Sequence, residues 1–408
     1  MTRTMPTALV GTGFSRGHLV QLDGLRGAAI LLVMFYHFCL PHTGFHGHDT
    51  GLLLQLAQGG WMGVDLFFVL SGFLITGILV ETREQAKYFR NFLGRRFLRI
   101  WPLYYLSLLV LLLVIPLAMS FSPPELQSMR DKQWWFWLYG SNWLFAKEGG
   151  FAQTSGGYFW SLAVEEQFYL VWPLVVYLLS PRNLLRTSVA LLFVSLIARI
   201  VLVRNGVATG SLYTMTFTHL DGLAVGSSIA ICLRSPQGEA RLRRAVPAAA
   251  AVAALGLLAV RYADGDLFFW SKNMATYGYT LIAVLFGAFL VRVLGGRREA
   301  SMRQRILSNG FMTRCGKYSY ALYMVHVPVA SFLYPRIAGG LAGAMPIIGY
   351  EGVFLVSAAA SFALSWALAV SSWYLFEKRI LALKRFFTYS GEPGSVAGVH
   401  SVAHTLPN

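Results

Sequence analysis

Charged residues are scarce in this sequence. Only 13% of the 408 residues are Asp, Glu, Lys or Arg, whereas 56% are hydrophobic and 14% are aromatic. A soluble domain carries about 25% charged residues, so this composition excludes an ordinary water-soluble protein. Several apolar runs reach the length of about 20 residues that one membrane crossing requires. The composition therefore indicates an integral membrane protein.

Acidic residues are outnumbered by basic ones, and cysteines are few. The chain has 18 Asp and Glu against 34 Lys and Arg, and a formal net charge of +16. The basic residues gather in alternate connections between apolar runs, which is the positive-inside pattern and not a nucleic-acid-binding patch. Cys39, Cys232 and Cys315 form no CxxC pair. We therefore expect no nucleic-acid partner, no disulfide framework and no metal site.

The apolar segments predict an all-α polytopic membrane protein with about ten transmembrane helices. Basic residues at both ends and in alternate connections predict that both termini are cytoplasmic. Residues 1–21 then form a cytoplasmic segment, 22–379 the transmembrane domain, and 380–408 a cytoplasmic, disordered tail. The predicted helices cover residues 22–42, 61–81, 100–120, 160–180, 184–204, 218–234, 243–262, 271–294, 318–336 and 349–375.

The first predicted helix carries two polar residues on one face. It contains LDGLRGAAILLVMFYHF, in which Arg26 and His37 interrupt an apolar run. Eleven residues at ~100° each make almost three turns, so both side chains project from one face, ~16 Å apart. Titratable groups in hydrocarbon cost several kcal/mol and usually mark a functional site.

Further titratable residues are expected at the outer level of the membrane, at the same depth as His37. Such groups satisfy one another only by facing inward, so we predict a buried polar cluster around His37. A carboxylate there would orient the ring as a general base, although a structural role for a buried histidine is the alternative. The residues at this level are Asp65, Glu165, Glu166, His219 and Asp221.

Arginines gather at the opposite, cytoplasmic level. RRFLRIWP supplies Arg95, Arg96 and Arg99, whose spacing places them on one helical face, and Arg26 has the same depth. Guanidinium groups bind phosphates through bidentate hydrogen bonds, or they merely set orientation and bind lipid headgroups. Coenzyme A has phosphates and a thin arm that would reach from these arginines to His37.

Six motifs occur in order along the chain: LDGLRGAAILLVMFYHF, GVDLFFVLSGFLI, RRFLRIWPLYY, WSLAVEEQFYLVWP, GKYSYALYMVHVPV and WYLFEKR. Through these motifs, residues 22–379 resemble membrane acyltransferase family 3, the bacterial O-antigen and peptidoglycan O-acetyltransferase-like proteins. The resemblance implies an enzyme of the bacterial inner membrane. It would transfer an acyl group, usually acetyl from cytoplasmic acetyl-coenzyme A, to a hydroxyl of a glycan, cell-envelope or secondary-metabolite acceptor.

The resemblance also suggests roles for individual residues. Arg26 with His37 matches the family's arginine–histidine motif, and Arg96 with Arg99 matches its RxxR motif. We expect His37, Glu165, Glu166 and Asp65 to be catalytic, with Glu165 preferred over Glu166 because Tyr169 lies one turn along its face. The expected cofactor-binding residues are Arg26, Arg95, Arg96, Arg99, Ser71 and Gly72. For Ser71 and Gly72 the alternative role is close packing between helices. We expect the following polar residues to bind the acceptor or to be structural: Tyr169, His219, Asp221, Tyr323 and His326.

A second function class fits the helix pattern. A transporter of a polysaccharide or lipid-linked sugar would also have polar residues inside a helix bundle, but no pair of Gly/Pro-interrupted helices supports it. Some family members carry a fused soluble domain that completes acyl transfer. We expect this chain to acylate its acceptor directly or to pass the acyl group to a separate protein. The acceptor, the acyl chain length and the oligomeric state stay open.

Overall fold

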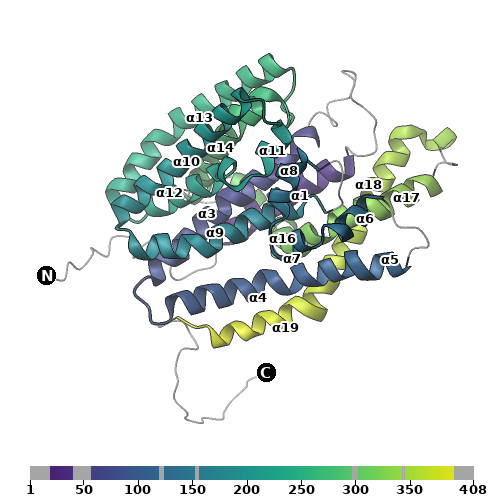
Figure 1. Cartoon of the computed structure of the whole chain (residues 1–408), viewed down its shortest axis with the longest axis horizontal. Coiled ribbons are helices and arrows are strands. Elements are labelled where there is room, and N and C mark those ends of the chain that lie inside the picture. Colours follow the sequence, from purple (N-terminus) through teal and green to yellow (C-terminus); the bar gives the residue numbers. More distant parts are fainter. Residues whose placement is uncertain are drawn as a thin grey trace, which may run out of the picture.

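The protein is an assembly of helices (Figure 1). The computed structural model describes residues 19–39, 57–118, 124–151, 156–295, 302–341, 343 and 345–389. Within these ranges every regular element is a helix and none is a strand, as the composition predicts.

Within the described residues, helical segments overlap each of the ten predicted ranges. They are α1 (Val20–Cys39), α3 (Gly63–Thr82), α4 (Tyr88–Leu109) with η2 (Val110–Val114) and α5 (Ile115–Ala118), α9 (Phe159–Leu178), α10 (Pro181–Arg204), α12 (Asp221–Cys232), α13 (Pro236–Asp264), η4 (Met274–Gly278) with α14 (Tyr279–Leu294), α16 (Gly310–Pro328) with η5 (Val329–Leu333) and α17 (Tyr334–Gly340), and α18 (Met345–Ser372).

Short helices fill the connections. They are η1 (Gly59–Met62), α6 (Pro124–Asp131), α7 (Trp134–Trp137), α8 (Ser141–Glu148), α11 (Thr209–Thr214), η3 (Thr216–Thr218), α15 (Met302–Leu307), η7 (Trp373–Glu377), α19 (Lys378–Leu381) and η8 (Ala382–Phe386).

Local sequence signals explain several helix starts. The hydroxyl of Ser180 accepts a hydrogen bond from the Asn183 amide at the start of α10, and Pro181 follows as the first helical residue. Ser235 and Pro236 make the same arrangement at α13. These caps satisfy amides that have no partner within the helix, and proline suits the first turn because its missing amide is not needed there.

Two helix starts were predicted more than seven residues too late. The third long helix begins at Tyr88 instead of residue 100, and the ninth begins at Gly310 instead of 318. In both, a basic amphipathic turn precedes the apolar run. The hydropathy pattern marks where the apolar run begins, whereas Arg and Lys are good helix formers that extend the helix beyond it. As a result Arg95, Arg96 and Arg99 lie within α4 itself.

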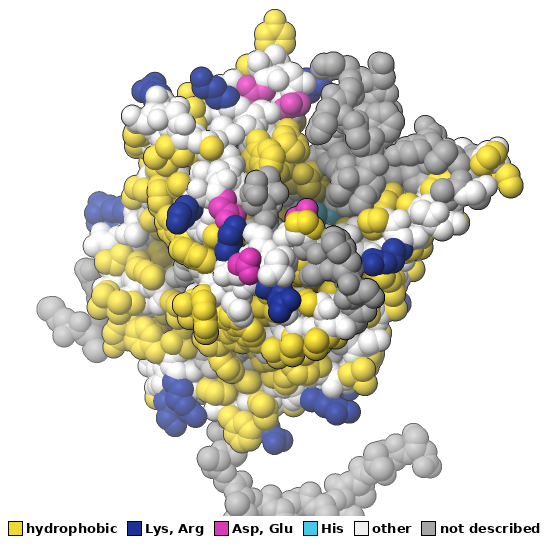
Figure 2. Space-filling view, turned by 45° about the vertical axis from the view of Figure 1, so that its right-hand side comes forward, with side chains coloured by type: hydrophobic (Ala, Val, Ile, Leu, Met, Phe, Trp, Pro, Cys, Tyr) yellow, Lys and Arg dark blue, Asp and Glu magenta, His cyan; other side chains and the backbone are white. Residues whose placement is uncertain are grey.

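Six helices are long and apolar enough to cross a membrane, within the described part of the chain. The apolar stretch of the helix containing α10 is only 17% buried inside the protein, and that of the helix containing α13 is also 17% buried. The apolar stretch of the helix containing α3 is 72% buried. The helices α1, α9 and α16 are not among the six. Hydrophobic side chains form a broad belt on the face in Figure 2, and Lys and Arg gather toward its edges.

The centre of the bundle is held by two close helix pairs, α3 with α12 and α1 with α16. At Gly72 of α3 an added Cβ would collide with the Leu223 carbonyl of α12, and at Gly226 of α12 it would collide with the Val69 carbonyl of α3. Small residues let helix backbones approach closely where no hydrophobic force drives association within lipid. Of the two roles predicted for Gly72, the structure shows close packing.

Candidate active site

One cavity lies between α1, α3, α4, α9 and α16. Its volume, counted with the open space at its mouth, is about 850 Å³. Its polar and aromatic lining residues are Arg26, Arg96, Arg99, Ser71, Ser161, Glu165, Tyr169, Ser319, Tyr320, Tyr323, Phe67 and Phe68. Five helices distant in sequence thus contribute to a single site.

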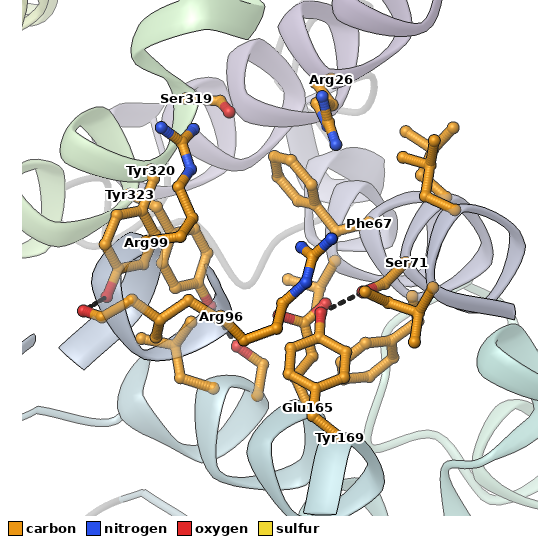
Figure 3. A pocket seen from close by; sticks show the side chains of 18 residues that line it. Arg26, Phe67, Ser71, Arg96, Arg99, Glu165, Tyr169, Ser319, Tyr320 and Tyr323 are labelled. Carbon is orange, nitrogen blue, oxygen red and sulfur yellow. Dashed lines mark hydrogen bonds between the residues drawn. The ribbon is translucent and has the colours of Figure 1, made fainter. Parts of the chain in front are cut away.

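Three arginines converge on this cavity. Arg26 approaches from α1, and Arg96 and Arg99 approach from α4, so that their guanidinium groups point toward a shared space (Figure 3). Arg26 also pairs with Asp23 at 3.2 Å, while the guanidinium of Arg96 lies over the Tyr169 ring at 6.0 Å. The structure therefore brings together the two arginine groups that the sequence placed at the same depth.

Arg95 does not line the cavity. Its Nε donates a hydrogen bond to the Phe387 carbonyl at 2.6 Å, and its guanidinium lies over the Tyr389 ring at 5.0 Å. Neighbouring helical residues project ~100° apart, so Arg95 and Arg96 cannot both face the same space. The predicted disordered tail is also ordered at its start, since residues 380–389 pack beside α4.

The paired glutamates of α9 face different surroundings. Glu165 lines the cavity, where its carboxylate interacts with the hydroxyls of Ser71 and Tyr169, which also hydrogen-bond to each other. Glu166 turns toward α4 and accepts a hydrogen bond from Trp101 Nε1 at 2.9 Å. The polar stripe that the sequence predicted along Glu165 and Tyr169 is thus present and includes Ser71.

His37 has a backbone partner and no carboxylate partner. Its Nδ1 lies 2.9 Å from the Val33 carbonyl one turn earlier in α1. Because a carbonyl only accepts, Nδ1 carries the proton and Nε2 keeps its lone pair. Among the residues that the structure describes, no carboxylate is hydrogen-bonded to this ring. The main chain therefore supplies the orientation that we expected from a carboxylate.

A second histidine lies beside the first. The rings of His37 and His326 meet edge to face, with 4.8 Å between centroids. His326 is completely buried, its Nδ1 faces the Tyr323 carbonyl at 2.8 Å, and its Nε2 has no hydrogen-bond partner among the described residues. Tyr323 lines the cavity, and its ring centroid is 5.4 Å from that of His326. The histidine pair therefore lies directly behind the cavity wall at Tyr323.

The remaining titratable residues form a separate network. His219 Nε2 pairs with Asp65 at 3.1 Å, and the His219 ring is enclosed by the rings of Phe68, Trp160, Tyr213 and Tyr279. Arg199 forms two hydrogen bonds to Asp221, at 2.8 and 2.7 Å. The single cluster expected around His37 is therefore divided between the histidine pair, the cavity and this network, and Asp65 contacts His219 instead of His37.

The sequence matches the family described as "Acyltransferase domain" over residues 19–370. The chain belongs to this acyltransferase family. Among named relatives, the peptidoglycan O-acetyltransferase OatA of Listeria monocytogenes is 29% identical over 338 residues, covering 79% of this chain and 51% of the relative. The O-acetyltransferase OatA of Staphylococcus aureus is 28% identical over 338 residues, covering 78% and 52%.

YrhL of Bacillus subtilis is 30% identical over 331 residues, which are 76% of this acyltransferase-family chain and 48% of YrhL. The chain thus spans about half the length of the curated relatives that it matches. No solved structure matches it significantly.

Two polar residues of the acyltransferase cavity were missed by sequence reasoning. Ser161 lies four residues before Glu165, so helical spacing places both on one face and was a usable signal. Tyr320 lines the cavity and donates a hydrogen bond to the Ile100 carbonyl at 2.7 Å. Its contact with α4, more than 200 residues away in sequence, had no local signal.

Proposed function

We propose that this chain is a membrane O-acyltransferase that moves an acetyl group from acetyl-coenzyme A to a hydroxyl of a glycan acceptor. The observation that carries the proposal is the cavity, with three convergent arginines and, behind its Tyr323 wall, a pair of histidines whose Nε2 atoms carry lone pairs. Family membership supports the reaction class, and the names of the two OatA relatives support O-acetylation.

The arginines would bind the donor. Arg26, Arg96 and Arg99 present guanidinium groups to the cavity, and such groups form short, charge-assisted hydrogen bonds to phosphate oxygens. The acyl-pantetheine arm would extend along the wall of Ser71, Glu165 and Tyr169 toward Tyr323. Along α1, the eleven residues from Arg26 to His37 span ~16 Å, a distance comparable to the reach of that arm.

His37 would act as the general base. Its Nε2 takes the proton of the acceptor hydroxyl while the hydroxyl oxygen forms a bond to the thioester carbonyl carbon. The tetrahedral intermediate collapses by breaking the carbon–sulfur bond, and the imidazolium returns its proton to the departing thiolate. The products are the acetyl ester and free coenzyme A. His326 Nε2 would accept a hydrogen bond from the acceptor and help to hold it.

The structure leads us to assign different roles to the other carboxylates. Glu165 would position the donor arm through Ser71 and Tyr169, because it alone of the glutamate pair lines the cavity. Glu166 would anchor α9 to α4 through Trp101. Asp65, His219 and Asp221 would hold α3, α10 and α12 together, since their side chains are almost completely buried and their contacts are with one another and with Arg199.

We propose that the protein crosses the bacterial inner membrane ten times, with both termini in the cytoplasm. The alternation of basic connections supports this topology, as do the helical segments that overlap the ten predicted ranges, six of which are long and apolar enough to cross a membrane. The donor would then enter from the cytoplasm at the arginine end. The acceptor would be a glycan of the peptidoglycan type, as the Listeria relative's name indicates for that protein. No specific observation favours the transporter alternative.

The test is a direct assay of acyl transfer. Purified full-length chain in lipid nanodiscs is incubated with acetyl-labelled acetyl-coenzyme A and either peptidoglycan fragments, cell-envelope glycans or no acceptor. We expect ester-linked label on a glycan, with one free thiol released per ester formed. Thiol release that does not depend on any acceptor, or no thioester consumption at all, contradicts the proposal.

A further inference from the structure

Two aromatic rings close the cavity on the side of the histidines. Tyr323 of α16 lines the cavity, and its ring centroid is 5.4 Å from that of His326. Phe67 lines the cavity from α3, and its ring meets the Tyr323 ring edge to face with 6.2 Å between centroids. Neither His37 nor His326 is among the described residues that line the cavity. Phe67 and Tyr323, here named the end wall, therefore separate the cavity from the histidine pair.

The end wall lies away from the arginine end of the cavity. An added Cβ at Gly316 of α16 would collide with the Asp23 carbonyl of α1, and the two histidine rings meet further along both helices, so α1 and α16 run side by side in the same direction. Arg26 pairs with Asp23 and thus lies at the level of Gly316. Tyr323 lies seven residues beyond Gly316, which is ~10 Å along the helix toward the histidines. A donor whose phosphates bind at the arginines would therefore point its acyl group at the end wall.

Tyr323 is anchored at its hydroxyl. This group donates a hydrogen bond to the Tyr158 carbonyl at 3.1 Å, and it also hydrogen-bonds to the Ser161 hydroxyl at 2.6 Å. The rings of Tyr158 and Tyr323 pack edge to face with 6.0 Å between centroids, and both residues are almost completely buried. Extra methylene groups in a packed site force side chains out of their preferred rotamers. The anchored ring therefore resists displacement by a longer ligand, whereas half-buried Phe67 faces that ligand directly.

We propose that the end wall sets the length of the acyl group, so that the donor is an acetyl thioester and longer acyl thioesters are excluded. This inference rests on the proposed function, because it takes the donor phosphates to bind at the arginines. The reason is space: the acyl group extends beyond the sulfur at the tip of the donor arm, and each added methylene must displace the ring of Phe67 or of Tyr323. Phe67 and Tyr323 are thus specificity-determining residues.

Calorimetric binding of acetyl-coenzyme A and butyryl-coenzyme A to the purified full chain in neutral detergent tests the proposal without needing an acceptor. The two extra methylenes should raise the Kd of butyryl-coenzyme A roughly tenfold or more above that of acetyl-coenzyme A in the unchanged chain. Phe67→Ala opens the end wall, so it should lower the Kd of butyryl-coenzyme A by about the same factor and leave the Kd of acetyl-coenzyme A within about threefold.

Two further variants make the test specific. Phe67→Leu keeps an apolar side chain of intermediate size, so its ratio of the two Kd values should fall between those of Phe67→Ala and the unchanged chain. Phe193→Ala is the matched control, because Phe193 is 54% exposed on α10 and lies outside the cavity lining. This control should keep the ratio of the unchanged chain. The thermal unfolding midpoint of each variant, measured in the same detergent, identifies any variant that fails to fold.

The outcomes distinguish this inference from the proposed function. If the unchanged chain binds butyryl-coenzyme A as tightly as acetyl-coenzyme A, the end wall does not select acyl length, and the proposed function stands. If folded Phe67→Ala and Phe67→Leu change both Kd values by the same factor, Phe67 is only structural and the inference is overturned. If the unchanged chain binds neither thioester, the donor site is misassigned, which overturns both proposals.

Discussion

The imidazole ring of His37 in α1 meets that of His326 in α16 edge to face, with 4.8 Å between their centroids. Each ring has its Nδ1 beside a main-chain carbonyl of its own helix, so neither has an Nε2 proton to offer the other. Each ring therefore keeps an Nε2 lone pair that can accept from a group that donates a hydrogen bond. A hydroxyl is such a group, and this relationship makes His37 the first residue to test.

Replacing His37 with Ala should abolish acyl transfer without unfolding the protein. A general base contributes roughly 10²–10⁴-fold to the rate, so kcat should fall by about that factor. The measurement is acetyl-coenzyme A turnover with acceptor, alongside calorimetric binding of coenzyme A, which should be unchanged because the arginines remain. Turnover like that of the unchanged chain would remove His37 from the catalytic role.

The two glutamates of α9 should respond differently to the same substitution. Glu165→Gln removes the carboxylate that lines the cavity beside the hydroxyls of Ser71 and Tyr169, so we expect roughly a tenfold loss of kcat/KM. Glu166→Gln keeps an oxygen that accepts from Trp101 Nε1 and should leave kcat/KM within about threefold. Equal losses in both variants would contradict the assignment of Glu165 to the cavity.

Removal of a cavity arginine should weaken binding of coenzyme A. Each of Arg96→Ala and Arg99→Ala removes charge-assisted contacts worth about 1.5–3 kcal/mol, which corresponds to roughly a tenfold to hundredfold increase in Kd. The control is Arg186→Ala, because Arg186 is exposed on α10 and hydrogen-bonds only locally to Asn183. Unchanged affinity in both cavity variants would indicate that these arginines serve orientation or lipid binding.

Arg199→Leu should destabilise the fold, since it leaves the completely buried Asp221 carboxylate without its two guanidinium hydrogen bonds. Breaking one side of a buried pair costs roughly 3–5 kcal/mol in free energy of unfolding. The double variant Arg199→Leu with Asp221→Leu should recover part of that loss. Chemical unfolding in detergent, followed by circular dichroism, measures both, and a single variant as stable as the unchanged chain would show that the pair does not stabilise the fold.

The sequence predicted those features that depend on position along one helix. An uninterrupted α1 places Arg26 and His37 on one face, and charge patterning placed Arg26 at the depth of Arg96 and Arg99, which the structure brings into one cavity. Spacing along α9 also predicted the stripe from Glu165 to Tyr169. These inferences needed only the helical repeat and the direction of each helix.

The sequence could not predict which helices are neighbours. Depth is one coordinate, and residues at one depth can lie on opposite sides of a bundle, which is why Asp65 contacts His219 and not His37. The sequence also did not show how each helix is rotated about its axis, so Arg95 was grouped with Arg96 although it donates a hydrogen bond to the Phe387 carbonyl. Neither distinction has a signature in composition or hydropathy.

The partner of His37 Nδ1 is the Val33 carbonyl, which every residue type at position 33 would supply. The protonation pattern of the ring is thus a property of the helical backbone and survives any side-chain substitution that leaves α1 helical. Natural variants can therefore change the surrounding side chains while the imidazole of His37 keeps the same orientation.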